Sequence, residues 1–458
     1  MLDLGEALPV HERWSEVNRE FLEFVERNPE YLRRDSFASV SAAPALRRFG
    51  VQPWPLFISS ARLRELESLA LGIDRLVKSV FPRFLGNSPA RIAEYFRSAG
   101  DPADQGGFTV RMSREMLMLL LDEPSGIESA PSRGDYMETA EGLRCIELNC
   151  GGSLGGLANN LVAEHHLASP GLRRFLGERG LAARGPDTMG ALFRHILEDT
   201  ARAGTWKGGE LNVALLVRPS DEAQIALTDP ELCNRELRQV LEERGVGAGG
   251  SALLCGPEDF VEDGGVLRVD GRPVHAVVEM HDGTADLRFP FWSFKRGRIS
   301  LYSGPISFLL SDKRNLALVS ENAGSDEFTA EERALIERHV PWTRRVLPGA
   351  TGFRGRAVRL PDDLPALRPE LVLKKATSLG GHHVFLGRNC TDEQWSALVA
   401  RALREEDWVV QEQLDSVPYC FQHGEAGASR SELIWGLLAF GSQFGGAFLP
   451  MQDDVFPD

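Results

Sequence analysis

Apolar residues in the first part of the chain recur every three or four positions, which is the spacing of an amphipathic helix. Between residues 14 and 31, for example, Phe21 and Val25 fall on one helical face, and residues 61–80 repeat the pattern. We therefore expect the chain to begin with a mainly helical region that ends near residue 122.

Beyond that region the pattern changes to short apolar runs that alternate with amphipathic segments. A stretch rich in Pro, Ser and Gly at residues 123–134 predicts a loop at the transition. The predicted strands cover 143–149, 211–217, 252–255, 274–280, 371–374, 384–387, 408–412 and 433–440. The predicted helices cover 156–168, 188–202, 231–244, 313–321, 329–339 and 392–405. This alternation is typical of a mixed α/β (α+β) fold.

The charge balance narrows the function classes. The chain of 458 residues has 51 basic and 66 acidic side chains, which gives a formal net charge of −15. A general nucleic-acid or membrane-surface binder needs a basic footprint, so we expect neither kind of partner. Any polyanion bound here must be held locally, by a few cationic side chains or by a metal ion.

Targeting and cysteine patterns indicate a cytoplasmic protein. The first residues lack a positive segment followed by an apolar one, so no signal peptide is predicted, and no apolar run reaches the length of a membrane span. The six cysteines are scattered without C-x-x-C pairs, a pattern that indicates reduced thiols rather than a disulfide framework or a zinc site.

The segment between residues 133 and 149 carries the strongest chemical signal. Arg133 and Asp135 precede Glu147 and Asn149, and the aspartate and the glutamate are twelve positions apart. Alternate side chains of a strand share a face, so Glu147 and Asn149 point the same way. With a carboxylate from a neighbouring strand, they are oxygen ligands suited to a hard cation such as Mg²⁺. E-x-N by itself is also common at polar strand ends.

Two further segments have the composition of a phosphate site. The glycine-rich residues 150–156 follow the predicted metal strand and lead into a predicted helix. The N–H groups at the start of a helix favour an anion, and glycines let the backbone approach it closely. An ordinary strand-to-helix turn would have the same composition. Lys313 begins a predicted helix, and Lys374 lies on a strand followed by Gly380 and Gly381. A strand–glycine turn–strand unit is suited to a flap over phosphates, with the lysine neutralising them.

A fourth segment, residues 408–415, is a hydrophobic strand that ends in Gln411 and Glu412, which would suit the polar edge of a base pocket. Only six of the basic residues are lysines, so the presence of Lys313 and Lys374 in these segments carries weight.

Together these segments resemble the ATP-grasp superfamily in its circularly permuted form, as in glutathionylspermidine synthase-like amide ligases and, more distantly, eukaryotic glutathione synthetase. The likeness rests on R-G-D with E-L-N (133–149), S-D-K-R-N-L-A-L (311–318), V-L-K-K-A-T-S-L-G-G (372–381) and V-V-Q-E (409–412). The metal-strand motif comes before the lysine strand and the flap, which is the order of the permuted branch.

The resemblance implies a circularly permuted ATP-grasp fold with an N-terminal helical region. It divides the chain into a mainly helical region (1–122), a metal-site and substrate-binding α/β part (123–300), and a nucleotide-binding lobe with a glycine flap (301–458). In eukaryotic glutathione synthetase the flap also carries a metal-binding glutamate, where this chain has Ser378 or Leu379, and Pro450 stands where the family often has an arginine.

The resemblance also implies an activity: an ATP-dependent carboxylate–amine ligase that forms an amide through an acyl phosphate, using ATP and Mg²⁺. Its substrates would be a small-molecule carboxylate and an amine, such as amino acids or a small peptide. The implied roles are metal binding by Asp135, Glu147 and Asn149; catalysis by Arg133 and Arg288; ATP binding by Lys313, Lys374, Gly380, Gly381, Gln411 and Glu412; and substrate binding by Ser153.

Two other function classes stay open. An ATP-dependent phosphotransferase acting on a small molecule would release ADP without an amine, and a non-catalytic ATP-grasp-like protein would bind nucleotide without turnover. The sequence does not identify the carboxylate or the amine, and a homodimer is one assembly that it allows.

Overall fold

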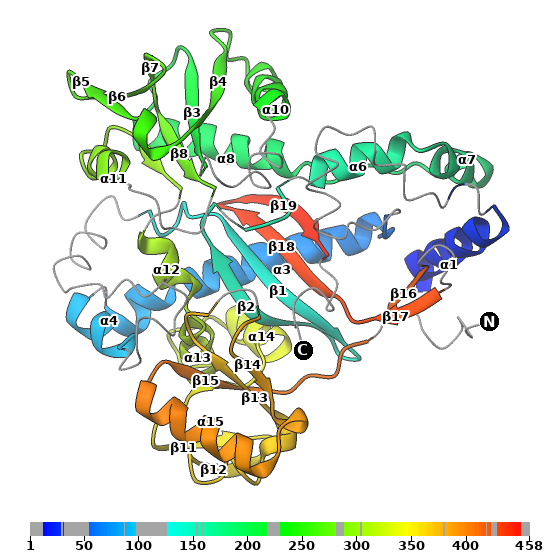
Figure 1. Cartoon of the computed structure of the whole chain (residues 1–458), viewed down its shortest axis with the longest axis vertical. Helices are drawn as coiled ribbons and strands as arrows, with labels where there is room; N and C mark the ends of the chain where they lie inside the picture. The colour runs from blue at the N-terminus through cyan, green and yellow to red at the C-terminus, as the bar shows by residue number, and fades with distance from the viewer. Residues whose placement is uncertain are drawn as a thin grey trace.

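The computed structural model describes residues 12–28, 31, 55–86, 88–97, 126–152, 154–157, 159–217, 230–280, 288–302, 305–378, 381–417, 419–422 and 428–449. Helices and several separate sheets alternate over these residues, so the predicted mixed α/β fold is confirmed (Figure 1).

A four-stranded antiparallel sheet lies at the centre of the molecule (Figure 1). Its order is β19 (Gln443–Phe448), β18 (Ile434–Phe440), β1 (Ser132–Thr139) and β2 (Gly142–Cys150), so β2 is an edge strand. Helix α3 (Ser60–Lys78) packs against β1, β18 and β19. The N-terminal region predicted to be helical therefore shares the core of this sheet.

Helix α3 is fixed to the start of β1 by a buried polar cluster. Lys78 Nζ lies 2.8 Å from Asp74 Oδ1 and donates to the carbonyl of Ala130 at 2.6 Å. The hydroxyl of Ser132 donates to the same Asp74 carboxylate at 2.5 Å. Buried charges are tolerated when they are paired and hydrogen-bonded, and this cluster places the first residue of β1 firmly on the helix.

A parallel sheet forms the upper part of the molecule in Figure 1. It contains β4 (Gly250–Cys255), β3 (Leu211–Leu216), β8 (Ala276–Glu279) and β9 (Ser300–Leu301), with α8 (Thr188–Ala203) and α10 (Pro230–Glu243) packed against its strands. All six residues of β3 are buried, as expected for a strand covered on both faces. A small sheet of β5 (Val261–Asp263), β6 (Val266–Val269) and β7 (Arg272–Pro273) and helix α11 (Arg288–Lys295) complete this part.

A third sheet, at the bottom of Figure 1, has the order β10 (Thr343–Arg345), β15 (Trp408–Glu412), β13 (Leu371–Lys375) and β14 (Val384–Leu386), all antiparallel. It packs on α15 (Asp392–Glu405) and the hairpin of β11 (Gly349–Phe353) and β12 (Arg356–Leu360). This unit has its own hydrophobic core, in which Trp395 and Trp408 are almost completely buried.

The remaining elements surround these sheets. They are α1 (Glu12–Arg27), α4 (Pro89–Tyr95), α6 (Asn159–Ala168), α7 (Pro170–Arg179), α12 (Pro305–Ser311), α13 (Arg314–Glu321), α14 (Ala330–His339), the pair β16 (Tyr419–Gln422) and β17 (Ala428–Ser431), a π-helix at Phe81–Leu85, and short 3₁₀ turns at Pro257–Asp259, Arg368–Glu370 and Gly387–Asn389. No helix among the described residues is both long and apolar enough to cross a membrane. The five cysteines whose side chains are described are free thiols.

Most predicted elements are present within a few residues of their predicted bounds, but the loop prediction for residues 123–134 was wrong at its end. Residues 132–134 already belong to β1. This strand contains few apolar residues, and it is held by pairing with β18 on one side and β2 on the other. Tertiary context of this kind overrides weak local strand propensity.

The glycine-rich loop after β2 lies against the parallel sheet at a point where no side chain fits. A Cβ atom on Gly152 would lie 2.0 Å from the carbonyl oxygen of Glu279, at the end of β8. The glycine therefore allows the loop after β2 to pass close to the backbone at the end of β8, which is one structural reason for the composition of this loop.

We expect Gly152→Ala to lower the melting temperature by several degrees, because a backbone clash of this kind forces the loop and β8 apart. The matched control is Gly177→Ala in α7, where a Cβ would meet no atom within 4 Å and alanine favours the helix. Differential scanning fluorimetry of both variants tests this, and an equal or smaller loss for Gly152→Ala would contradict the assigned packing.

Candidate functional site

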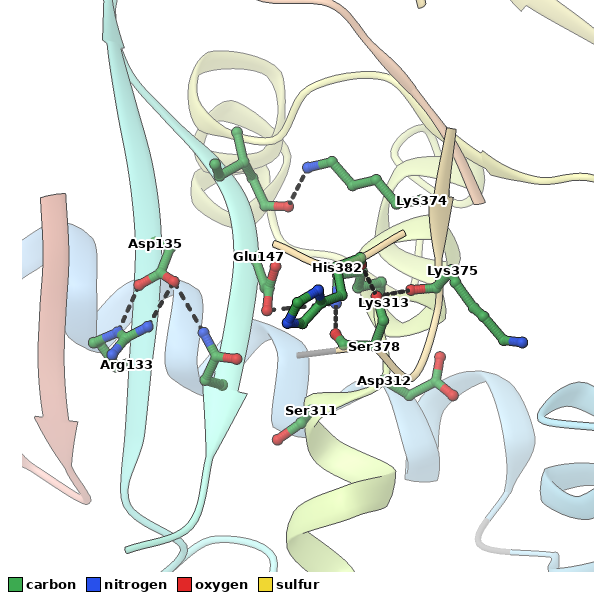
Figure 2. A network of polar contacts seen from close by, with 12 residues as sticks. Arg133, Asp135, Glu147, Ser311, Asp312, Lys313, Lys374, Lys375, Ser378 and His382 are labelled. Carbon is green, nitrogen blue, oxygen red and sulfur yellow. Dashed lines mark hydrogen bonds and ion pairs between the residues drawn. The ribbon is translucent and has the colours of Figure 1, made fainter. Parts of the chain in front are cut away.

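The register of β1 on β2 brings the predicted metal-site residues together. Arg133 lies opposite Asn149, and Asp135 lies opposite Glu147. The guanidinium of Arg133 forms a fork on Asp135, with Nε–Oδ1 and Nη2–Oδ2 distances of 2.7 and 2.8 Å (Figure 2). Asn149 Nδ2 donates to the same Asp135 carboxylate at 3.0 Å. The motif spacing thus corresponds to cross-strand neighbours on one face of the sheet.

Arg133 also ties this face to the glycine-rich loop. Its Nη1 donates to the carbonyl of Leu154, and its guanidinium lies over the ring of Phe448 at 5.9 Å. A Cβ on Gly436 in β18 would lie 2.9 Å from Arg133 Cδ, so the neighbouring strand leaves room for this side chain only because it has glycine there. The arginine is consequently held in one position.

Burial raises the pKa of Asp135, while the Arg133 fork and the Asn149 amide act in the opposite direction by stabilising the carboxylate. Asn149 uses its nitrogen on this contact, which leaves its Oδ1 as the atom suited to a cation. The oxygens of Asp135, Glu147 and Asn149 form the hard donor set that Mg²⁺ prefers, so these residues fit the implied metal. Among the described residues, no group of three or more His, Cys, Asp or Glu side chains is arranged to hold a metal ion, and the candidate set here has only two carboxylates beside the amide of Asn149.

Lys313 reaches this face from the loop between α12 and α13. Its Nζ lies 3.5 Å from Glu147 Oε1 and donates to the carbonyl of Ser378, below the predicted flap, at 2.5 Å (Figure 2). Its own N–H donates to the carbonyl of Ala376 at 3.0 Å. The preceding Ser311 hydroxyl accepts a hydrogen bond from the N–H of Cys150 at 2.8 Å. Lys313 is therefore fixed between β2 and the lysine strand.

Lys374 reaches β2 from the third sheet. Its Nζ donates to the side-chain Oε1 of Gln411 at 2.7 Å and to the carbonyl of Ile146 at 3.3 Å. Ile146 is the extra residue of a β-bulge, because Asp135 pairs with Glu147 while Tyr136 pairs with Cys145. The contact joins the third sheet to the edge strand of the central one, where backbone groups have no further strand to pair with.

The adjacent Lys375 has a different environment. Successive side chains of a strand point to opposite faces, and Lys375 Nζ lies 3.0 Å from Glu405 Oε2 on α15. Arg401 and the indole N–H of Trp408 also donate to Glu405. Lys375 is completely buried in this structural cluster, whereas Lys374 points toward β2 (Figure 2).

The side chains predicted to border a base have other contacts. Gln411 holds Lys374, as described above. Glu412 forms an ion pair with Arg354, with Nη2–Oε1 at 2.8 Å, and lies 3.7 Å from Arg144 on β2. Their predicted role in base binding stays a prediction.

The other predicted residues are less connected to this face. Arg288 is an exposed residue at the start of α11, directly after residues 281–287, which lie outside the described part. Ser153 and Gly380 also lie outside the described residues. Gly381 is in the turn between β13 and β14 with a φ of 75°, a left-handed conformation that glycine adopts without strain.

Sequence reasoning missed two contributors to the site, the hydroxyl of Thr343 and the carbonyl of Ser378. Gln411 Nε2 donates to Thr343 Oγ1 at 3.0 Å, and Ser378 accepts from Lys313. Ser378 lies within the 372–381 motif and Thr343 lies in none, but neither contact could be predicted, because each joins elements distant in the chain.

Comparisons with known proteins bear on the fold. No protein-family model and no curated protein matches the sequence. Among solved structures, the chain is similar to a glutathione synthetase-like effector (GSS30) from Globodera pallida in its apo form. The match covers 94% of this chain and 92% of that chain, with a TM-score of 0.54 and 12% sequence identity. The mixed α/β architecture is therefore similar to the fold of that glutathione synthetase-like effector.

Burial lowers the pKa of Lys374 from its ordinary value of 10.5 to about 8. Between these two pH values the Lys374 side chain binds a proton in the unfolded chain but not in the folded one, so this group contributes a free energy of unfolding that rises with pH. The buried thiols of Cys145, Cys150 and Cys255, whose pKa values burial raises to about 12, contribute in the opposite direction above pH 9. The full effect of Lys374 is on the order of 3 kcal/mol.

The difference in free energy of unfolding between the parent and Lys374→Met should therefore rise by this amount across the window, whereas the difference between the parent and Lys207→Met, at an exposed position, should stay constant. Urea unfolding of the parent and both variants at several pH values between about 8 and 10.5 provides the measurement. Identical pH dependence in the parent and Lys374→Met would show that Lys374 is not the group responsible.

Proposed function

We propose that the protein is an ATP-dependent carboxylate–amine ligase that forms an amide bond through an acyl phosphate. The observation that carries this proposal is the meeting of Lys313 and Lys374 with a face that bears Asp135, Glu147 and Asn149. Oxygen ligands for Mg²⁺ next to fixed ammonium groups provide what a triphosphate requires. The glutathione synthetase-like fold supports the same class of reaction.

The proposed fold is the circularly permuted form of ATP-grasp. In support, the metal strands β1 and β2 precede the lysine strand β13 and its turn in the chain. The nucleotide would lie between β2 and the third sheet, and the substrates would be a small carboxylate and an amine, such as amino acids or a small peptide. The proposed compartment is the cytoplasm.

The charges around the site explain how such a reaction would proceed. A carboxylate that attacks the γ-phosphate brings two anions together, so the developing charge must be neutralised. Magnesium held by Asp135, Glu147 and Asn149 would supply part of this positive charge. Lys313 and Lys374 would bind phosphate oxygens, and Arg133 would contact the transferring phosphoryl group. The turn between β13 and β14 would exclude water, which would otherwise hydrolyse the acyl phosphate.

One observation favours a second candidate, a non-catalytic nucleotide-binding protein. Arg133 forms a bidentate pair with Asp135 and also donates to the carbonyl of Leu154, so a residue assigned to catalysis already has protein partners. A phosphotransferase that uses the same ATP site is the third alternative. ADP release measured with and without an amine separates the three.

We expect ADP release only when a carboxylate and an amine are both present, in a screen of amino-acid pairs followed by mass detection of the amide. Glu147→Gln should reduce this turnover by at least about a hundredfold, because it removes a metal-binding charge from the site of phosphoryl transfer. Because Glu147 also faces the buried ammonium of Lys313, the melting temperature of the variant should fall by a few degrees, so turnover is compared at a temperature at which both proteins are folded.

The control for this experiment is Lys207→Met, which alters an exposed lysine. Full turnover in Glu147→Gln would contradict the assignment of the metal strand. ADP release without amine would favour the phosphotransferase, and ATP binding without turnover across the screen would favour the binding protein.

A further inference from the structure

Lys374 and Lys375 are neighbours in the chain with acceptors of different charge. Lys375 Nζ lies 3.0 Å from the carboxylate of Glu405, which neutralises it. Lys374 Nζ is held at 2.7 Å by the neutral amide oxygen of Gln411 and at 3.3 Å by the neutral carbonyl of Ile146. An ammonium group has three N–H donors, so these two contacts orient Lys374 and leave one donor for a ligand.

The orientation of the Gln411 amide is set by a chain of hydrogen bonds. The hydroxyl of Thr343 donates to the carbonyl of Pro341 at 2.9 Å, so its oxygen is the acceptor for Gln411 Nε2 at 3.0 Å. With the nitrogen held on Thr343 and, at the longer distance of 3.5 Å, on the carbonyl of Ile146, the amide oxygen faces Lys374. Thr343 and Gln411 are 0% and 2% exposed, so water does not compete with this arrangement.

The charges nearest to the bulge leave an excess of one positive charge. Arg133 and Asp135 cancel each other, while Lys313 and Lys374 face the single carboxylate of Glu147. A glutamate at position 411 would form a direct ion pair with Lys374 and remove this excess. A glutamine keeps the lysine in place without neutralising it.

We propose that Gln411 is a positioning residue that holds the Lys374 ammonium through a neutral acceptor, with its amide oriented by Thr343, so that the charge of Lys374 is available to a phosphate of the nucleotide. This inference rests on the proposed function for the presence of a nucleotide. It assigns Gln411 to the phosphate end of the site through Lys374, and it adds Thr343 to the residues that determine affinity for the triphosphate.

The decisive variant is Gln411→Glu. If Gln411 only stabilises the fold, this variant should bind Mg·ATP as the parent does, whereas if Gln411 keeps Lys374 available to phosphate, the affinity should fall. The ion pair with Lys374 offsets part of the loss of the amide N–H donor to Thr343, so the melting temperature should stay within a few degrees of that of the parent. The affinity for Mg·ATP should fall about tenfold, because phosphate would compete with the new carboxylate for Lys374. Isothermal titration calorimetry and thermal unfolding of the same preparations give both quantities.

Two variants of Thr343 test the hydrogen-bond chain. Thr343→Val keeps the shape but removes the hydroxyl, so the amide loses its fixed orientation and Mg·ATP affinity should fall several-fold, by about one hydrogen bond. Thr343→Ser keeps the hydroxyl and should retain most of the affinity of the parent. Each variant removes one group from the core: Thr343→Val removes the hydroxyl, and Thr343→Ser removes the methyl. Lys207→Met is the surface control and should bind as the parent does.

The outcomes distinguish this inference from the function on which it rests. A parent protein that does not bind Mg·ATP would overturn both. A parent that binds Mg·ATP, with Gln411→Glu binding equally well or more tightly, would overturn only the role of Gln411. Equal affinities for Thr343→Val and Thr343→Ser would overturn the role of the Thr343 hydroxyl.

Discussion

The pairing register of β1 and β2 is the constraint on which the candidate site depends. It places Asp135 opposite Glu147 and Arg133 opposite Asn149, so four polar side chains share one face. If β2 slipped by one residue against β1, both Glu147 and Asn149 would turn to the other face of the sheet, because the side-chain period of a strand is two. The surrounding structure secures this register through the α3 cluster at Ser132 and through β18 on the far side of β1.

The candidate site also requires that two lysines from later segments of the chain, Lys313 and Lys374, meet this face. Lys374 contacts the backbone of β2 across 228 positions in the sequence, and Lys313 contacts Glu147. These contacts link a sheet with its own hydrophobic core to the central sheet. Electrostatics and tertiary packing are therefore coupled here: the groups that would bind phosphates also hold the two units together in this structure.

The sequence predicts those parts of the candidate site that depend on the spacing of residues along one strand. The E-x-N strand and the lysine strand could be predicted because strand periodicity determines which side chains share a face. Arg133 of the R-x-D motif falls in a predicted loop, although it belongs to β1. The bulge at Ile146 and the partners of Gln411 and Glu412 could not be predicted, because they depend on which sheets meet. A strand that ends in Gln-Glu has the same pattern whether its side chains face a base, a lysine or, as for Glu412, an arginine.

The two lysines at positions 374 and 375 illustrate the same limit. Their order in the chain predicts opposite faces of a strand, but not which face meets the site. The structure decides this through Glu405, whose carboxylate is held by Arg401 and Trp408 on the helix side of the sheet. A substitution of Lys374 therefore alters the contact with β2, whereas the same substitution of Lys375 removes the lysine that pairs with Glu405.

The bulge at Ile146 also fixes how long β2 must be. Deleting this one residue would restore regular pairing with β1 but would remove the carbonyl that receives Lys374. Inserting another residue would carry Glu147 and Asn149 away from Arg133 and Asp135. Substitutions along β2 should therefore be tolerated better than insertions or deletions. In diverged homologues that keep this site, we expect the number of residues between the aspartate and the glutamate to vary less than the identities of those residues.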